Sequence, residues 1–422
     1  MRKLLFMGCF ITQTLLAQKT ILHCGQLIDV KQLQVQKEMS IIIEGNKITD
    51  VVSGYVKASE KDKVIDLSAT TVMPGLIDCH VHMEHETSSN RMKPFIQNEA
   101  DIAFESLQYA KITLLSGFTT VRDVGGSGVN IAMRNAINKK QIIGPRIYTS
   151  GKALSSTGGH GDATNGLRND LMHIHELNAD VVNGVEECRK AVRQRYKDGA
   201  DVIKIAATGG VLSLEKDGSG AQFTEEEIRT IVTTAKDYGM KVAAHAHGVE
   251  GIKRAVRAGV ASIEHGTYLD DETIELMKKM GTYHVPTIIA GKSVADSAKK
   301  PGYFPDIIAK KATEVGSVIQ GTFARSYKAG VKIAFGTDAG VYAHGKNWLE
   351  FVYMTEAGMP VLECIKAATF NAADLLGNDQ LGVIEKGKIA DVIAVDGDPV
   401  KDVKVMGKVK FVMKNGEIFK NE

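Results

Sequence analysis

The chain has 422 residues, which is enough for one large α/β barrel together with a smaller unit. Its 52 Lys and Arg residues nearly balance its 50 Asp and Glu residues, and no basic block stands out, so we expect no nucleic-acid partner. The chain contains 42 Gly but only 8 Pro residues, a composition that favours tight turns between strands and helices over Pro-rich linkers.

The N-terminus has the pattern of a secretory signal. After a basic start, an apolar stretch runs from Leu4 to Leu16, and Ala17 is the small residue that a signal peptidase requires. The stretch is shorter than the roughly 20 residues of a membrane span, so we expect no membrane association after cleavage. The alternative is a first element of the fold. We predict a signal peptide over residues 1–17 and a secreted or periplasmic protein, with a lipoprotein anchor at Cys9 left open.

Both ends of the remaining chain show β-hairpin patterns. Near the N-terminus, two strand-like runs flank the turn Glu44–Lys47, and near the C-terminus two more flank Lys414–Glu417. Because both ends are all-β and the middle is not, we predict that residues 18–73 and 390–422 together form one small composite β-sandwich.

Between residues 74 and 389, strands alternate with helices. The eight strand candidates are residues 76–82, 118–123, 145–150, 202–206, 241–246, 262–265, 283–288 and 332–338. The clearest helix begins after Thr224, an N-cap with Glu227 as its capping-box partner, and ends at Gly239. Eight strands with helices between them predict an α/β fold of the TIM type, a (β/α)8 barrel, over residues 74–389.

Five of these strands bring histidine, lysine or aspartate to their C-terminal ends. The residues are His80, His82, Lys204, His245, His265 and Asp338. His80 and His82 lie two apart, so both side chains point to the same side of their strand. A closed barrel collects these ends around one mouth, where buried polar groups need partners. Because the set exceeds what one tetrahedral zinc ion requires, the pattern predicts two metal ions.

Lys204 is the unusual member of this set, because an ammonium group is repelled by a cation. One alternative is that Lys204 pairs with an acid at the barrel mouth. The other is that burial lowers its pKa and the neutral amine takes up carbon dioxide, so that the resulting carbamate bridges two metals.

The sequence motifs around these residues resemble those of the amidohydrolase superfamily, and within it those of the Xaa-Pro dipeptidase-like (imidazolonepropionase-like) branch. The matching motifs are residues 73–82 (MPGLIDCHVH), 158–161 (GGHG), 203–204 (IK), 208–213 (TGGVLS), 245–247 (HAH), 264–266 (EHG) and 336–340 (GTDAG). The resemblance runs from about residue 20 to the C-terminus. It implies a binuclear zinc site in which His80, His82 and Asp338 hold one ion, His245 and His265 hold the other, and carboxylated Lys204 bridges them.

Other residues receive roles from the same resemblance and from their positions. Asp338 is expected to take a proton from the water shared by the metals and to return it to the departing nitrogen. His160 stands in a Gly-rich loop that supplies a donor to the substrate in relatives, so we assign it a carbonyl or carboxylate contact. His247, Tyr342 and His344 are further candidates for substrate contact. His23, His85, His173, His175 and His284 have no comparable placement and are treated as ordinary.

Three functions are compatible with these observations. The first is an exported zinc-dependent hydrolase that acts on a small peptide or amide substrate, cleaving dipeptides or the C-terminal residue of small peptides. A homo-oligomer is left open. The second is a cyclic amide or imidazolone hydrolase, and Lys204 and the signal both count against it. The third is a non-catalytic metal or solute binder, which would not need Asp338. For the first function, we expect His160 and His247 to recognise a free C-terminal carboxylate.

Overall fold

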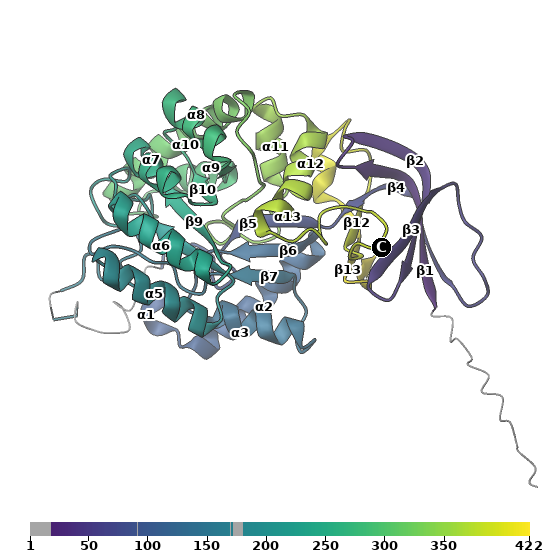
Figure 1. The fold of residues 1–422 in the computed structure, drawn as a ribbon, viewed down its shortest axis with the longest axis horizontal. Helices are drawn as coiled ribbons and strands as arrows, with labels where there is room; N and C mark the ends of the chain where they lie inside the picture. Colours follow the sequence, from purple (N-terminus) through teal and green to yellow (C-terminus); the bar gives the residue numbers. More distant parts are fainter. Residues whose placement is uncertain (1–17, 91, 169, 172–179) are drawn as a thin grey trace, which may run out of the picture.

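The computed structural model describes residues 18–90, 92–168, 170–171 and 180–422, so the predicted signal peptide, His173 and His175 lie outside the described residues. Figure 1 shows two parts. A barrel of strands surrounded by helices occupies one end, and a β-sheet built from the purple N-terminal and yellow C-terminal segments occupies the other.

The sheet at the second end joins the two termini of the described chain. Its strands are β1 (Lys19–Asp29), β2 (Gln34–Glu44), β3 (Lys47–Ser53), β4 (Lys63–Pro74), β12 (Val392–Val395), β13 (Val409–Lys414) and β14 (Glu417–Asn421). They are ordered β14-β13-β12-β4-β1-β2-β3. The join is an antiparallel pairing of β12 with β4, while β4 runs parallel to β1. The prediction of a composite β-domain is confirmed.

This sheet folds over its own apolar core. Its two hairpins lie at opposite ends of the strand order, yet Asn46 Nδ2 in one donates to Asn415 Oδ1 in the other at 3.1 Å. Between them, alternate residues of the strands form one buried cluster that includes Leu22, Ile48 and Phe411. The period-2 alternation of each strand places these residues on the inner face.

The barrel contains two parallel sheets. One holds β5 (Leu76–Val81), β6 (Phe118–Asp123) and β7 (Arg146–Thr149), and the other holds β8 (Val202–Ala206), β9 (Lys241–Ala246), β10 (Ser262–His265) and β11 (Tyr283–Val285). All neighbouring strands in these sheets pair in parallel. Seven of the eight predicted strands therefore appear, with ends that differ by up to three residues.

The eighth predicted strand, at 332–338, is not a regular strand. It meets its neighbours through single bridges, between Ile333 and His284 on one side and between Ala339 and Val81 on the other. Asp338, at the end of this segment, has a left-handed φ of 60°, which a regular strand does not allow. On the opposite side of the barrel, Leu154 bridges to Ile205. These contacts close the two sheets into the predicted TIM-type barrel.

Helices follow most of the barrel strands (Figure 1). They are α1 (Lys93–Ile96), α2 (Glu99–Leu115), α3 (Val129–Asn138), α5 (Gly184–Asp198), α6 (Glu225–Asp237), α7 (Val249–Ala258), α8 (Asp271–Met280), α9 (Ile288–Ala298), α10 (Asp306–Lys328), α11 (Leu349–Glu356), α12 (Val361–Ala367) and α13 (Phe370–Leu376), with a short 3-10 helix at Val403–Gly407. Helix α6 begins with the predicted capping box of Thr224 and Glu227. None of the helices in the described ranges has the length and apolar character of a membrane span.

Candidate metal centre and active-site cavity

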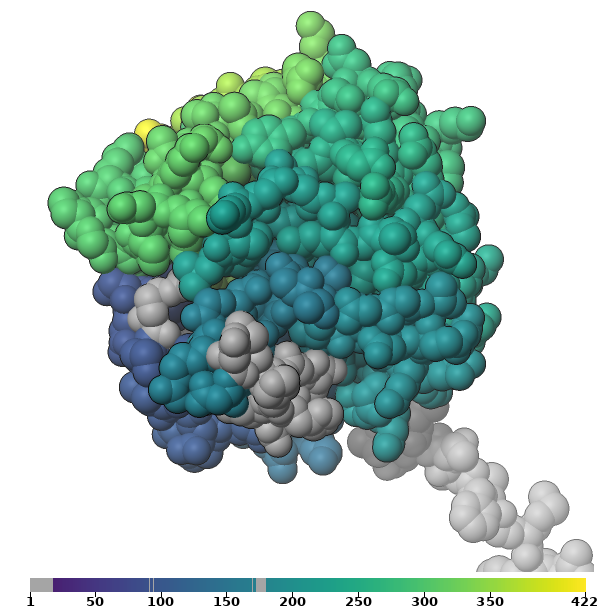
Figure 2. Space-filling view, turned by 90° about the vertical axis from the view of Figure 1, so that its left-hand side faces the viewer, coloured from purple at the N-terminus to yellow at the C-terminus, as the bar shows by residue number. Residues whose placement is uncertain are grey.

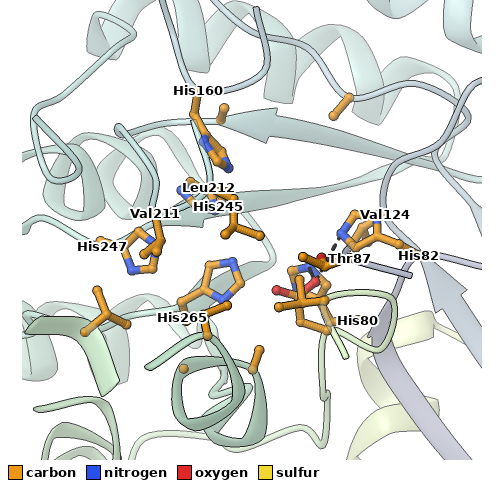
Figure 3. Close-up of a pocket in the computed structure, with 18 of the residues that line it drawn as sticks. His80, His82, Thr87, Val124, His160, Val211, Leu212, His245, His247 and His265 are labelled. Atoms are coloured by element: carbon orange, nitrogen blue, oxygen red, sulfur yellow. Dashed lines mark ion pairs between the residues drawn. The ribbon is translucent and has the colours of Figure 1, made fainter. Parts of the chain in front are cut away.

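The six residues predicted as metal ligands line one cavity at the carboxyl ends of the strands. They are His80, His82, Lys204, His245, His265 and Asp338. Two groups of ligand atoms come together, one from His80, His265 and Asp338 and the other from His245, His247 and His265, and within each group all atoms lie within 4.8 Å of one another. Figure 3 shows the rings of His80, His245 and His265 around a common space.

Burial keeps His80, His245 and His265 neutral, which suits them to bind a cation. Burial lowers the pKa of His80 to about 4 and holds those of His245 and His265 well below the ordinary value. For His82, burial acts in the same direction, but the adjacent Asp338 carboxylate outweighs it and raises the pKa. Neutral imidazoles have a nitrogen lone pair free for a metal.

Hydrogen bonds on the far side of each ring decide which nitrogen faces the cavity. His80 donates from Nδ1 to Glu264 Oε2 at 2.8 Å, and His82 donates from Nδ1 to the Gly125 carbonyl at 2.7 Å. His245 instead donates from Nε2 to the Gly209 carbonyl at 3.1 Å. Each bond leaves the other ring nitrogen as an acceptor, which is the tautomer that metal ligation needs.

Among the described residues, the Asp338 side chain has a buried oxygen without a hydrogen-bond partner. Its Oδ1 is buried and lies 3.2 Å from His82 Nε2 and 3.5 Å from His80 Nε2, without a well-aligned hydrogen bond to either. Buried carboxylate oxygens are normally paired. A divalent cation among these three side chains would pair it, so the residues present fit a metal site.

Lys204 lies at the centre of the cluster, with Nζ 3.5 Å from His80 Nε2. Burial lowers its pKa to about 8, so a substantial fraction of the amine is neutral near pH 7 to 8. Across the described ranges the structure records no ion pair for Lys204 within 4.0 Å, although the Glu264 charge acts on it. A buried and partly neutral amine is the setting that the carbamate alternative requires.

Two buried residues below the cluster were not predicted. Arg122 on β6 donates from Nη2 to Glu264 Oε1 at 2.8 Å, and Glu264 holds His80 through its other oxygen. Burial acts to raise the pKa of Glu264, but Arg122 outweighs it and the pKa falls to about 2. Arg122 therefore keeps ionised the carboxylate that orients His80. The sequence signal was a charged residue inside the apolar run 118–123.

A second buried network supports the turn that presents Asp338. Asp78 Oδ2 accepts from Thr337 Oγ1 at 2.6 Å and from Asn347 Nδ2 at 2.8 Å. The turn needs support because Asp338 has a φ of 60°, and His265 likewise has a φ of 71°. Non-glycine residues in this region are strained and occur mainly at functional sites.

The cavity has a volume of about 260 Å³, and its histidines share the lining with an apolar wall. This wall, called the apolar wall below, consists of Val211, Leu212, Ala290, Gly291, Val294, Val315, Ile319 and Val341. Most of it comes from α9 and α10, which sequence reasoning did not connect with the site. Within the described part of the chain, the lining includes no arginine and no acid other than Asp338.

His160 and His247 both line the cavity, as predicted for residues near the substrate. The His160 ring stacks on His245 with centroids 4.3 Å apart, and its Nδ1 lies 2.5 Å from Ser213 Oγ. His247 Nδ1 lies 2.7 Å from Thr267 Oγ1. Burial lowers the pKa of His160 to about 4 and that of His247 to about 3. Both rings are therefore neutral near pH 7.

Three sequence-based assignments need correction. Tyr342 and His344 do not line the cavity, because the Tyr342 side chain packs into the hydrophobic core and the His344 ring stacks on Tyr109. His85, treated as ordinary, does line it. His284 keeps its ordinary assignment, since it is buried between Ser326 Oγ and the His265 carbonyl, and His23 lies in β1 of the β-domain.

The carboxyl ends of the barrel strands lie on a face to which distant parts of the sequence contribute. In Figure 2, blue, teal and green segments meet on the side turned away from the β-domain. A parallel barrel with ionisable side chains converging at its mouth is the arrangement of a barrel enzyme.

Known proteins identify the class. The amidohydrolase family matches residues 71–419, and the chain belongs to this family. An ochratoxinase from Aspergillus niger is 33% identical over 432 residues, covering 96% of this chain and 87% of the relative. The crystal structure of a Xaa-Pro dipeptidase with bound methionine in the active site is 51% identical, with a TM-score of 0.93 and coverage of 96% of this chain and 100% of that one. A prolidase complexed with N-methylphosphonate-L-proline is 34% identical, with a TM-score of 0.88 and the same coverage. The predicted resemblance is confirmed.

Proposed function

We propose that the protein is an exported zinc-dependent amidohydrolase that cleaves dipeptides or removes the C-terminal residue of small peptides. The main support is the convergence of two groups of ligand atoms, each within 4.8 Å, beside a cavity of about 260 Å³. Family membership supports hydrolysis of an amide bond. The likeness to a Xaa-Pro dipeptidase and a prolidase supports a peptide substrate.

The family resemblance divides the donor set between two zinc ions, so that His80, His82 and Asp338 would hold one ion and His245 and His265 the other. The geometry supports two adjacent ions, because one group of ligand atoms joins His80, His265 and Asp338 and a second joins His245, His247 and His265. In such sites divalent ions supply polarisation of a carbonyl and a lower pKa for water.

Lys204 would join the two halves of this site after carboxylation. The lone pair of the neutral amine forms a bond to the carbon of carbon dioxide, and the amine proton leaves to solvent. The product is a carbamate anion with two oxygens. It replaces a repulsive ammonium with a negative group among the histidines, which suits a cation site better.

The proton transfers fall to Asp338. Its carboxylate is the cavity's only acid among the described residues, and His80 and His82 outweigh the effect of burial and hold its pKa below the ordinary value. An ionised carboxylate accepts a proton from the attacking water and then donates it to the leaving nitrogen as the carbon–nitrogen bond breaks.

The apolar wall indicates the substrate class. Burying a charged side chain against Val294, Val315 and Ile319 would leave that charge without a partner, whereas an apolar side chain is stabilised there. We propose dipeptides with an apolar side chain, which agrees with the methionine bound in the 51% identical relative. For the substrate carboxylate, His247 is the remaining donor candidate.

A dipeptide panel tests this function. The protein, loaded with zinc and supplied with bicarbonate, should cleave Met-Pro and Leu-Pro much faster than Asp-Pro or Lys-Pro, and should bind about two ions per chain by elemental analysis. C-terminal amides of the good substrates should be poor substrates. Cleavage of cyclic amides but no dipeptide would contradict the proposal and favour an imidazolone-type hydrolase.

Export has a separate test. Residues 1–17 provide the basis, and the mature protein recovered from its native cells should begin at residue 18 and should be found outside the cytoplasm. A cytoplasmic protein that still begins with Met1 would contradict export and leave the proposed chemistry untouched.

A further inference from the structure

A lysine from α10 fixes the loop that follows β8. Lys311 is buried, with an exposed fraction of 7%. Its Nζ donates to the backbone carbonyls of Gly210 at 2.7 Å, Ser213 at 2.8 Å and Glu215 at 3.0 Å. A buried ammonium needs such acceptors, so these three bonds determine the path of residues 210–215 along the cavity.

The same loop presents a chain of side-chain hydrogen bonds to His160. Glu215 Oε1 accepts from the Gly210 N–H at 2.8 Å and lies 2.5 Å from Ser213 Oγ. Ser213 Oγ in turn lies 2.5 Å from His160 Nδ1. Because Glu215 Oε1 is already the acceptor of the Gly210 N–H, it also acts as the acceptor toward Ser213, and a serine hydroxyl has a single hydrogen. Ser213 therefore donates to Glu215 and accepts from the N–H of His160 Nδ1.

The His160 ring is held in this orientation by its surroundings. It stacks on His245, and a Cβ atom at position 210 would lie only 2.2 Å from it, so Gly210 leaves the space that the ring fills. A neutral imidazole with its hydrogen on Nδ1 has a lone pair on Nε2. His160 lines the cavity (Figure 3), and since its Nδ1 is bonded to Ser213, the nitrogen left for a substrate is Nε2, an acceptor.

We propose that Glu215 and Ser213, fixed by Lys311, are positioning residues that make His160 an acceptor for the protonated amino group next to the scissile carbonyl of the substrate. The proposal rests on the proposed dipeptide hydrolysis and names which end of the dipeptide His160 binds. An acceptor nitrogen repels a carboxylate, so this polarity favours the amino end over the carboxylate contact that the family resemblance implies.

The amino group is the substrate donor that best fits this nitrogen. A dipeptide has donors at its terminal amine and, unless the second residue is proline, at its amide nitrogen. Only the terminal amine is present whatever the second residue is. A hydrogen bond to a charged group also discriminates strongly, because such bonds are about twice as strong as those between neutral groups.

The kinetic test compares Met-Pro with its analogue in which hydrogen replaces the amino group. With zinc-loaded protein we expect kcat/KM to be about 10- to 100-fold higher for Met-Pro, the range for losing one hydrogen bond to a charged group. Ser213→Ala should reduce this ratio to near one, mainly through KM for Met-Pro, and Ser213→Thr should restore it. Ser219→Ala is the matched control, since Ser219 Oγ donates to Asp217 Oδ1 in the same loop without contacting His160.

Equal kcat/KM values for the two compounds in an active wild-type enzyme would overturn the inference and leave the proposed hydrolysis intact. A ratio unchanged by Ser213→Ala would also overturn it.

A second measurement needs no activity. Nitrogen-15 spectra of histidine-labelled protein, with the His160 signals assigned by their loss in His160→Gln, should show a hydrogen on Nδ1. This signal should change in Ser213→Ala and not in Ser219→Ala. A hydrogen on Nε2 would overturn the inference even if no dipeptide is cleaved, so failure here is distinct from failure of the proposed function.

Discussion

The two walls of the cavity are built in different ways. The polar wall consists of side chains at the ends of barrel strands, and nearly every one is held by a directional bond, such as His80 by Glu264 and His82 by the Gly125 carbonyl. The apolar wall consists mainly of side chains from α9 and α10, whose mutual contacts are non-directional.

This difference separates chemistry from specificity. A change in the polar wall removes a ligand or breaks a buried hydrogen bond, and no neighbour can replace the lost group. A change in the apolar wall alters volume and shape, which packing tolerates at moderate cost. We therefore expect variants of the polar wall to lose activity for all substrates, and variants of the apolar wall to change which substrate is preferred.

The largest effect is expected for Lys204→Ala. If carboxylated Lys204 bridges two ions, its loss should remove most of the metal and nearly all activity, because a shared ligand has no local substitute. Elemental analysis and a dipeptide assay measure both quantities. Lys241→Ala is a suitable control, since Lys241 lies at the opposite end of β9 and donates to the Asp374 and Leu375 carbonyls. Retention of metal and activity in Lys204→Ala would identify Lys204 as an ordinary buried lysine.

Asp338→Asn should have the next largest effect. Asn keeps an oxygen for the metal but cannot accept the proton, so kcat should fall by roughly 10² to 10⁴ while most metal remains. Steady-state kinetics and elemental analysis on the same preparation check both parts. Near-normal turnover would show that another group, with His160 the first to examine, accepts the proton.

The sequence predicted the polar wall well because its signals are local. A histidine at the end of an apolar strand is visible in a few residues, and barrel closure then brings His80, Lys204 and His265 together. The regular alternation of hairpins likewise predicted the composite β-domain.

The rest depends on contacts between distant segments. Arg122 and Glu264 are 142 positions apart in the sequence, and the pattern of neither strand indicates that the two side chains form a pair. Tyr342 was misplaced because the chain after Asp338 turns through a left-handed conformation, which redirects the residues that follow. The apolar wall was missed because a helix pattern shows which face is buried but not whether that face meets the core or a cavity.

Arg122→Leu tests how far the polar wall depends on the buried ion pair between Arg122 and Glu264. The change leaves Glu264 as an unpaired buried carboxylate, so unfolding free energy should fall by about 3 to 5 kcal/mol, measured by denaturant titration. The exposed pair of Arg229 and Glu225 offers a control, where Arg229→Leu should cost less than about 1 kcal/mol. Equal losses in the two variants would show that the buried pair has no special role.

The smallest effect is expected in the apolar wall. Val294 lies on α9 and lines the cavity, so Val294→Ala removes apolar contacts without touching a ligand. Because one methylene in an apolar pocket changes discrimination by roughly 10- to 200-fold at most, kcat/KM for Met-Pro should fall by about 10-fold, while that for Ala-Pro should change little. Metal content should be unchanged. Val318→Ala on the neighbouring α10 is the control, since Val318 is 37% exposed and does not line the cavity. An equal loss for both substrates in Val294→Ala would mean that this wall supports the ligands rather than the substrate, and the distinction between the two walls would fail.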